Sequence, residues 1–459
     1  MRVLVVSWYL PPQNAMGALR VGKLCKYLFR RGHDVRTLTV ALNLSPEGRP
    51  AVEIPEEQIV RTPWIDINKP ARPDFWLPRR ARSAHGAPAR EAKASNEAIA
   101  GRPTAPGPLR RLVRALDGAY RAATSVPDPR IGWYPFAVRA GRRMLADWRP
   151  EIVFASAPPF TGLLIGRRLA RLHGVPWVAE YRDRFVEDPY SRRSWLARLR
   201  DTTVENWWLR GVAGIVTVSE PWAEDYRARL GVPVVTVYNG FDPEEFPADY
   251  PRRASDPATL GIVYTGILYP ERRDPSPLFA ALGLLGEDRA RVRVDFYGAD
   301  TTVLNAMAAR HGVLDRVGLH ARVPYRDSID LQMNADVLLL LQWNDPKERG
   351  NVPGKLFEYL GARRPVLGIG FEDGVPARLL KERGAGIVLN DPARIADRLG
   401  GWIEQKRALG AIPLLPLEAR RGFAREDQYA LTERFLVERA AEGLGGWRGD
   451  GPARRGDRA

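Results

Sequence analysis

The residues best suited to chemistry lie in one short stretch, residues 350–360, which reads GNVPGKLFEYL. Pro353 is favourable at the start of a helix, and in such a helix Lys355 and Glu358 lie one turn apart on the same face. A lysine, the free N–H groups at a helix start and a carboxylate can together bind a diphosphate and a ribose diol. The alternative is a surface ion pair, which contributes roughly a few tenths of a kcal/mol. The stretch follows the apolar run 337–342, and this favours binding, because ligands of parallel sheets lie beyond such runs.

Two neighbouring arginines follow another apolar run. Arg272 and Arg273 come shortly after residues 262–265. A guanidinium at that place can donate two hydrogen bonds to phosphate oxygens, although a loop arginine by itself is usually only solvated. With Lys355 expected at the same edge, we interpret this pair as part of an anion site.

The first half of the chain offers two further candidates. Gly17 opens the first predicted helix, whose free N–H groups favour an anion. Asp183 follows the apolar run 177–180 and can act as a base or orient an acceptor hydroxyl; a contact with its neighbour Arg182 is the structural alternative. A Gly-x-Gly-x-x-Gly motif is absent at the first helix, which disfavours a dinucleotide cofactor.

Alternating strands and helices must position these loops. Short apolar runs alternate with amphipathic stretches such as 19–29 and 163–172, a pattern typical of parallel sheets covered on both faces. The runs of the first half are 3–6, 35–40, 152–155, 177–180, 215–218 and 234–237, and those of the second half are 262–265, 292–297, 317–323, 337–341, 366–369 and 387–389. The pattern predicts an α/β protein with two doubly wound domains and a cleft between them.

Proline content and periodicity predict where the domains divide. The proline-rich stretch 241–257 has no clear apolar period and is interpreted as a linker. The predicted units are an N-terminal domain 1–240, the linker 241–257, a C-terminal domain 258–420, a helix 421–443 that packs back across the linker, and a disordered tail 444–459. The core of that helix is expected at 425–441.

Charge is concentrated in one segment. The 459 residues carry a net charge of +16, and residues 69–114 hold eleven Lys or Arg against three Asp or Glu. This segment is Ala-, Pro- and Arg-rich, and we interpret it as a flexible insertion of the first domain. The following stretch 109–121 is either a surface helix packed on the core or a basic amphipathic helix that contacts anionic lipid.

Several classes of protein are excluded or disfavoured. Cys25 is the only cysteine, so disulfides within the chain and cysteine-based zinc sites are excluded. No run is long enough for a transmembrane helix or a signal peptide, and a cytoplasmic protein is expected. Zinc-finger spacing, heptads and RNA-binding aromatic signatures are absent, which disfavours nucleic acid as a partner. None of the five histidines lies at an obvious strand end, and an Asp-x-Asp pair is absent, so we expect no metal and no other cofactor.

The motifs together resemble family 4 glycosyltransferases of the GT-B fold, particularly the bacterial branch that builds cell-surface polysaccharides. The likeness covers nearly the whole chain apart from the insertion. The most specific stretch is PGKLFEY at 353–359, and the others are VVSWYLPP at 5–12, DPRIGW at 128–133, SAPP at 156–159, YRD at 181–183, VYNGFD at 237–242 and YTG at 264–266.

The resemblance implies a nucleotide-diphosphate sugar bound in the C-terminal domain. Lys355, with Arg272 or Arg273, would hold the diphosphate, and Glu358 would accept hydrogen bonds from the ribose. The loop with Val323 and Pro324 would contact the base, and Gly17 would approach the diphosphate when the domains close. The resemblance also implies retention of anomeric configuration and transfer of a hexose-type sugar to a glycan or a lipid-linked acceptor.

Two departures from the family pattern concern the catalytic residues. Many members have two glutamates with seven residues between them, and the first position is Gly350 here, with Asn351, Val352 and Glu348 nearby. The histidine that many relatives place after a first-domain strand is also absent, with SAPP at 156–159 in its position. The alternatives are therefore a non-catalytic nucleotide-sugar or glycan binding protein and another GT-B enzyme, such as a sugar-nucleotide epimerase. For the transferase, the basic segment predicts peripheral attachment to the anionic inner face of a membrane.

Overall fold

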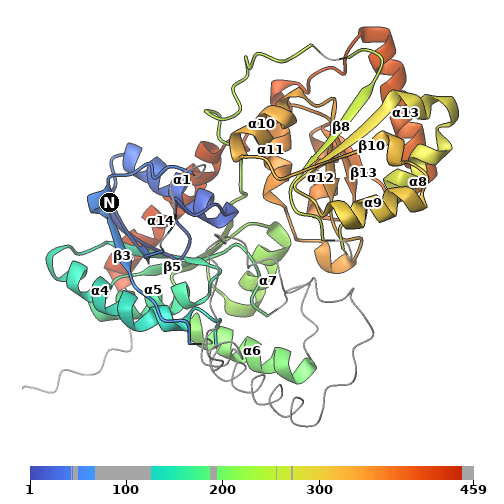
Figure 1. The fold of residues 1–459 in the computed structure, drawn as a ribbon. Helices are drawn as coiled ribbons and strands as arrows, with labels where there is room; N and C mark the ends of the chain where they lie inside the picture. Colours follow the sequence, from blue (N-terminus) through green and yellow to red (C-terminus); the bar gives the residue numbers. More distant parts are fainter. Residues whose placement is uncertain are drawn as a thin grey trace, which may run out of the picture.

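The computed structural model describes residues 1–42, 44, 50–67, 126–186, 194–254, 256–269 and 272–446. Two parallel sheets, one in each half of the chain, form two domains that lie side by side (Figure 1). The predicted basic insertion 69–114 and the stretch 109–121 lie outside the described residues.

The first domain contains a sheet of seven parallel strands in the order β3-β2-β1-β4-β5-β6-β7. Its elements are β1 (Arg2–Ser7), α1 (Met16–Arg30), β2 (Asp34–Val40), β3 (Ile59–Thr62), α4 (Tyr134–Asp147), β4 (Ile152–Ala157), α5 (Thr161–His173), β5 (Trp177–Tyr181), α6 (Trp195–Trp208), β6 (Gly214–Thr217), α7 (Glu220–Leu230) and β7 (Val234–Thr236).

The second domain contains six parallel strands in the order β10-β9-β8-β11-β12-β13. Its elements are β8 (Leu260–Thr265), α8 (Ser276–Leu284), β9 (Val292–Tyr297), α9 (Thr301–Arg310), β10 (Val317–His320), α10 (Tyr325–Asn334), β11 (Val337–Leu341), α11 (Gly354–Ala362), β12 (Val366–Ile369), α12 (Val375–Glu382), β13 (Gly386–Val388) and α13 (Pro392–Leu409). The last helix is α14 (Arg425–Gly446).

Both faces of the first sheet are buried, which is why its strands are continuous apolar runs. Successive side chains of a strand point to opposite faces. In β1, Leu4 and Val6 belong to the core beneath α4 and α5, whereas Val3 and Val5 belong to the core beneath α1 and α14. The predicted doubly wound α/β architecture is confirmed for both halves.

Helix α14 returns from the second domain to the first. In Figure 1 it lies beside α1, although it comes last in the chain. Its side chains Tyr429, Phe435 and Leu436 are buried in the same core as Val3 and Val5. The Tyr429 hydroxyl donates a hydrogen bond to the Arg20 carbonyl at 2.9 Å. Helix α14 is therefore part of the N-terminal core.

Three sequence predictions about strands and helices require correction. Strand β3 was not predicted, because Ile-Val-Arg-Thr is a short edge strand with only two buried residues. Strand β10 ends at His320 rather than at 323, because the residues after it are exposed as the chain turns toward α10. His320 therefore lies at a strand end after all. Helix α14 continues to Gly446, past the predicted end at 441 and into the segment assigned to the tail.

Candidate active site

Each sheet has a switch point at which the strand order reverses, between β1 and β4 in the first and between β8 and β11 in the second. Ligands of open parallel sheets bind outside the carboxyl ends of the strands at such a point. The loops there carry the residues described below.

Lys355 extends from the first turn of α11 to the end of β8. Its Nζ lies 4.4 Å from the centre of the Tyr264 ring, and a Cβ built on Gly266 would lie 2.0 Å from the same nitrogen. Gly266 has a φ of 132°, a backbone conformation that favours glycine. The glycine therefore leaves space for the ammonium group, which stands beside the N-terminus of α11, where anions are favoured.

Glu358 lies one turn further along α11 and is 5% exposed. Its Oε2 accepts a hydrogen bond of 3.2 Å from Gln332 of α10, and the same amide donates to Thr265 Oγ1 at 3.3 Å. Burial raises the pKa of the Glu358 carboxyl above its ordinary value, while the Gln332 hydrogen bond and the charges of Arg425 and Lys355 lower it. The carboxyl is held in place, and its charge depends on the cations around it.

Arg425, the first residue of α14, is a buried cation near Glu358. It is 4% exposed, and among the described residues its Nε and Nη1 have no hydrogen-bond partner. Burial alone would lower the pKa of this guanidinium, but two tyrosines and the carboxylates of Glu245 and Glu358 raise it. Arg425 is therefore a charged group close to the Glu358 carboxylate.

The two arginines after β8 point in different directions. The Arg272 guanidinium lies 5.2 Å from the centre of the Trp343 ring, in the loop after β11. Arg273 instead turns back on its own loop, where Nη1 donates to the Ile267 carbonyl at 3.3 Å and the guanidinium lies over Tyr269. Arg272 is therefore the arginine that faces the switch point.

The loop predicted to contact a base leads into α10. Val323 is half-buried and Pro324 is exposed, and both directly precede the first residue of the helix. Beside this loop, the His320 ring stacks on Tyr297 with centroids 4.3 Å apart and planes 12° apart. This aromatic surface at the carboxyl ends of β9 and β10 was not predicted from the sequence.

Gly350, the position of the missing family glutamate, lies against the other domain. A Cβ built there would come within 2.4 Å of Trp222 Nε1 and 3.1 Å of Ser219 Oγ, at the start of α7. A side chain at this position would therefore require Trp222 to move. Asn351, half-buried, donates to Glu348 Oε2 at 2.8 Å, and Glu348 is 2% exposed. Val352, predicted to lie near the donor sugar, is also buried, at 4% exposed.

In the first domain, Gly17 lies directly against Arg182. A Cβ built on Gly17 would come within 1.7 Å of Arg182 Nη1. Arg182 Nε donates to Ser156 Oγ at 3.2 Å, and Nη2 donates to the Pro158 carbonyl. Burial lowers the pKa of this guanidinium. Asp183 is exposed next to it, at the carboxyl end of β5.

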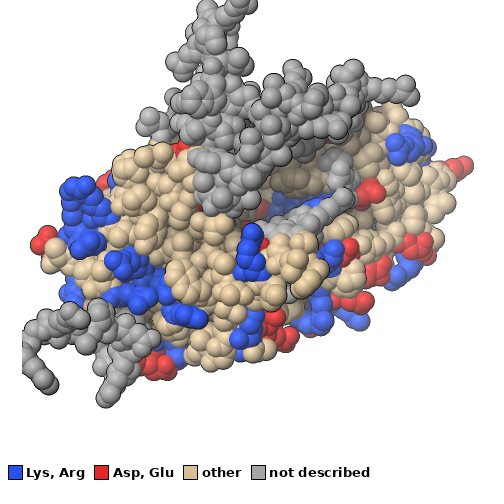
Figure 2. All heavy atoms as spheres, turned by 90° about the horizontal axis from the view of Figure 1, so that it is seen from below, with Lys and Arg blue, Asp and Glu red and all other residues tan. Residues whose placement is uncertain are grey.

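The starts of α1 and α11 meet across the two domains. A Cβ built on Gly354 would come within 3.0 Å of Met16 Cε, so the first turns of the two helices touch. Figure 2 shows the surface hollowed near its middle, between the end formed by the first domain and the end formed by the second. The site thus places Arg182 with one helix N-terminus and Lys355 with the other.

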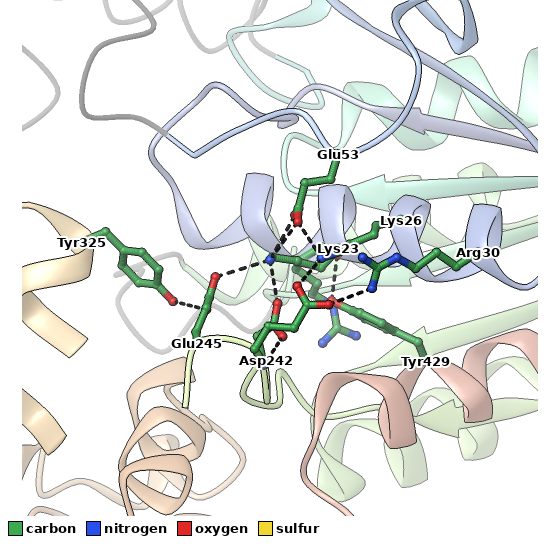
Figure 3. A network of polar contacts seen from close by, with 10 residues as sticks. Lys23, Lys26, Arg30, Glu53, Asp242, Glu245, Tyr325 and Tyr429 are labelled. Carbon is green, nitrogen blue, oxygen red and sulfur yellow. Dashed lines mark hydrogen bonds and ion pairs between the residues drawn. The ribbon is translucent and has the colours of Figure 1, made fainter. Parts of the chain in front are cut away.

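A network of charged side chains connects α1 with the chain between the sheets (Figure 3). Its members are Lys23, Lys26, Arg30, Glu53, Asp242, Glu244, Glu245, Tyr325 and Tyr429. Lys23 Nζ lies 2.6 Å from Asp242 Oδ2 and 3.4 Å from Glu245 Oε1. The Tyr325 hydroxyl donates to the other oxygen of Glu245 at 2.9 Å. Through Glu245, α1 is linked to the helix that begins at the predicted base loop.

Sequence reasoning assigned no site role to four residues of this arrangement. Trp343 lies two residues after β11 and Arg182 directly after β5, and this position near a strand end was the signal that could have identified them. Trp222 and Arg425 lie far from the other site residues in the chain, and no local pattern marks them.

Among the residues that the structure describes, no group of three or more His, Cys, Asp or Glu side chains is placed to hold a metal ion. The expectation of a metal-independent reaction stays a prediction. None of the helices in the described part of the chain combines the length and the apolar character needed to cross a bilayer.

The chain was compared with family models, curated proteins and solved structures. The model of the family described as Glycosyltransferase Family 4 matches residues 100–245. No curated protein matches the chain. A solved structure of sucrose-phosphate synthase from Thermosynechococcus elongatus is 14% identical, with 96% of this chain and 99% of that chain covered and a TM-score of 0.58.

Two further solved structures are similar over their whole lengths. HepE from Anabaena, in complex with UDP and glucose, is 14% identical, covers 95% of this chain and 100% of that chain, and has a TM-score of 0.57. WaaG, a glycosyltransferase involved in lipopolysaccharide biosynthesis, is 14% identical, with 97% of this chain and 100% of that chain covered and a TM-score of 0.52. At these identities the likeness concerns the fold, and it confirms the two-domain GT-B architecture.

Proposed function

We propose that this protein is a family 4 glycosyltransferase that moves a hexose-type sugar from a nucleoside diphosphate to a glycan or lipid-linked acceptor. The observation that carries the proposal is the position of Lys355, whose ammonium group lies at the second switch point beside the N-terminus of α11. The family match in the first domain supports the same activity independently.

In the proposed complex, the C-terminal domain holds the donor. Lys355 and Arg272 bind the diphosphate, Glu358 accepts hydrogen bonds from the ribose, and the loop with Val323 and Pro324 contacts the base. Arg273 donates a hydrogen bond to its own loop and contributes at most secondarily to diphosphate binding. UDP is the first nucleotide to test, because HepE was solved with UDP and glucose.

The reaction breaks the bond between the anomeric carbon and the diphosphate oxygen. The diphosphate leaves with the electron pair, and the lysine, the arginine and the amides of α11 stabilise its charge without a metal ion. The acceptor oxygen attacks from the same face of the sugar, which retains the anomeric configuration. Its proton passes to the departing diphosphate, with Asp183 in place to orient the acceptor. Gly17 and Arg182 approach the diphosphate from the first domain.

The acceptor determines where in the cell the protein would act. A lipid-linked acceptor would place the enzyme at the inner face of the plasma membrane, in polysaccharide biosynthesis of the cell envelope. WaaG, with a role in lipopolysaccharide biosynthesis, supports this proposal by its similar fold.

The first test measures nucleotide binding by Lys355→Ala. We expect this change to weaken UDP binding by about 1.5–3 kcal/mol, the usual contribution of a hydrogen bond to a charged group. Isothermal titration calorimetry without added metal measures the effect. Lys381→Ala, which removes an exposed lysine of α12 in the same domain, is the matched control and should bind as the wild type does.

Binding and transfer must be measured separately. Equal affinity of Lys355→Ala and wild type would remove Lys355 from the site. Binding of UDP-sugars with no transfer to any acceptor and no hydrolysis would favour the non-catalytic binding protein. Conversion of the free nucleotide sugar into its epimer would favour the epimerase.

A further inference from the structure

Helix α6 presents apolar side chains to solvent. Trp195 is 72% exposed, and Leu196 and Leu199 are each 59% exposed. Trp207, three turns later, is 50% exposed. At 3.6 residues per turn these four side chains fall within an arc of about 120°. Unlike a usual surface helix, α6 therefore carries an apolar stripe on its outer side, which is interrupted between Leu199 and Trp207 by Thr203 and Asn206.

The inner side of the same helix is acidic. Asp201 is 4% exposed and Glu205 is 1% exposed. Glu205 Oε2 pairs with Arg229 of α7 at 2.6 Å, and Glu205 Oε1 accepts a hydrogen bond from Tyr226 at 3.3 Å. These buried partners fix the rotation of α6 about its axis, so the outward direction of the apolar stripe is set by specific bonds.

Guanidinium groups flank the stripe. The Arg167 guanidinium, from α5, lies 4.7 Å from the centre of the Trp207 ring. Burial lowers the pKa of Arg167, and the nearby charges of Arg171 and Arg210 lower it further. Three cations are thus gathered at one end of the stripe, of which Arg171 and Arg210 are exposed and Arg167 is buried beneath Trp207.

Further charges have the same sign. Arg198 is exposed on α6 beside the stripe, and Arg200, also exposed, pairs with Asp201 at 2.7 Å. The outer surface of α6 and its surroundings therefore combine apolar and cationic character.

We propose that the outer face of α6, together with the exposed Arg171 and Arg210, docks the protein on an anionic membrane surface. Tryptophan and leucine enter the boundary between headgroups and acyl chains, and arginines bind the phosphates above it. The net charge of +16 is in keeping with an anionic partner. The surface belongs to the first domain, which would hold the acceptor in the proposed reaction.

The experiment measures cosedimentation of the whole protein with vesicles of phosphatidylcholine, alone or mixed equally with phosphatidylglycerol. Trp195→Ser with Leu199→Gln removes the apolar anchors, and Arg171→Glu with Arg210→Glu reverses two of the cations. Leu284→Gln with Leu409→Gln is the matched control, because these leucines of the second domain are 60% and 63% exposed. Thermal unfolding shows that each variant is folded.

Wild type and the leucine control should bind the anionic vesicles alike and bind phosphatidylcholine weakly. Each α6-region variant should lose vesicle affinity by at least about tenfold. The proposal is overturned if wild type does not bind the anionic vesicles, or if both variants bind as wild type does. It is also overturned if the wild type is a dimer that the Trp195 and Leu199 changes dissociate, because the stripe then covers a second copy. UDP binding by the same variants should be unchanged, which separates this result from failure of the proposed activity.

Discussion

At Glu358, a carboxylate proposed to accept hydrogen bonds from a ribose is held in a site that is only 5% exposed. Burial raises the pKa of this carboxyl, and the ionised form accepts hydrogen bonds from the ribose hydroxyls more strongly than the neutral form does. Nucleotide affinity should therefore fall as pH is lowered through this raised pKa. The affinity of Glu358→Gln should be weaker and independent of pH over the same range, as measured by calorimetry.

The stability of the ligand-free protein should change in the opposite direction. The folded state binds the Glu358 proton more tightly than the unfolded state does. The stabilisation that results is fully present below the pKa that Glu358 has in the unfolded state, and it is lost as pH rises through the pKa that it has in the folded state. Arg425→Met removes a charge that lowers the pKa, so it should move the loss of nucleotide affinity to higher pH. An Arg425→Met profile identical to wild type would show that this cation does not control Glu358.

At the scale of elements, the network around α1 determines how the domains are joined. Lys23 is 12% exposed and contacts Asp242, Glu245 and Glu53, so Lys23→Met would leave carboxylates without their cation. We expect a loss of roughly 1.5–3 kcal/mol in the free energy of unfolding, measured in urea.

Glu244 provides the control for this prediction. The hydrogen bonds from Lys26 and Arg30 lower the pKa of Glu244 to about 2, but its side chain is 55% exposed and solvent screens these pairs. Glu244→Gln should therefore lower the free energy of unfolding by less than about 1 kcal/mol. In the wild type, the stabilisation of the folded state by ionised Glu244 should be lost as pH falls from the ordinary pKa range of glutamate toward 2. Equal losses for the Lys23 and Glu244 variants would show that burial does not distinguish the two parts of the network.

The elements were more predictable than the contacts between them. Apolar runs identified all the central strands, and the rule for parallel sheets then placed Lys355 and Arg272 at one edge. Local pattern did not predict β3, whose arginine interrupts an already short run, or the outward stripe of α6. The orientation of α6 depends on Arg229, and the obstruction at Gly350 depends on Trp222. Such contacts join residues distant in the chain, and one sequence does not contain them as a local signal.

For the whole molecule, the last helix makes the two domains dependent on each other. Helix α14 starts at Arg425, near Glu358 in the second domain, and ends in the core of the first. Phe435 lies so close to Gly214 of β6 that a Cβ on that glycine would come within 2.4 Å of its ring. The first domain is therefore incomplete until α14 has folded onto it.

Leu436→Ala tests this dependence, because Leu436 is fully buried in the core shared by α1, α14 and the sheet. Truncation of a buried leucine leaves a cavity and should cost about 2–5 kcal/mol. Tryptophan fluorescence during urea unfolding reports mainly on the first domain, since ten of the 13 tryptophans precede residue 240. Val437→Ala changes the next residue, which is 46% exposed, and should shift the unfolding free energy by less than about 0.5 kcal/mol. If both variants unfold at the same urea concentration, α14 does not stabilise the first domain. If only Leu436→Ala unfolds at a lower urea concentration, the last helix is a structural part of the first domain.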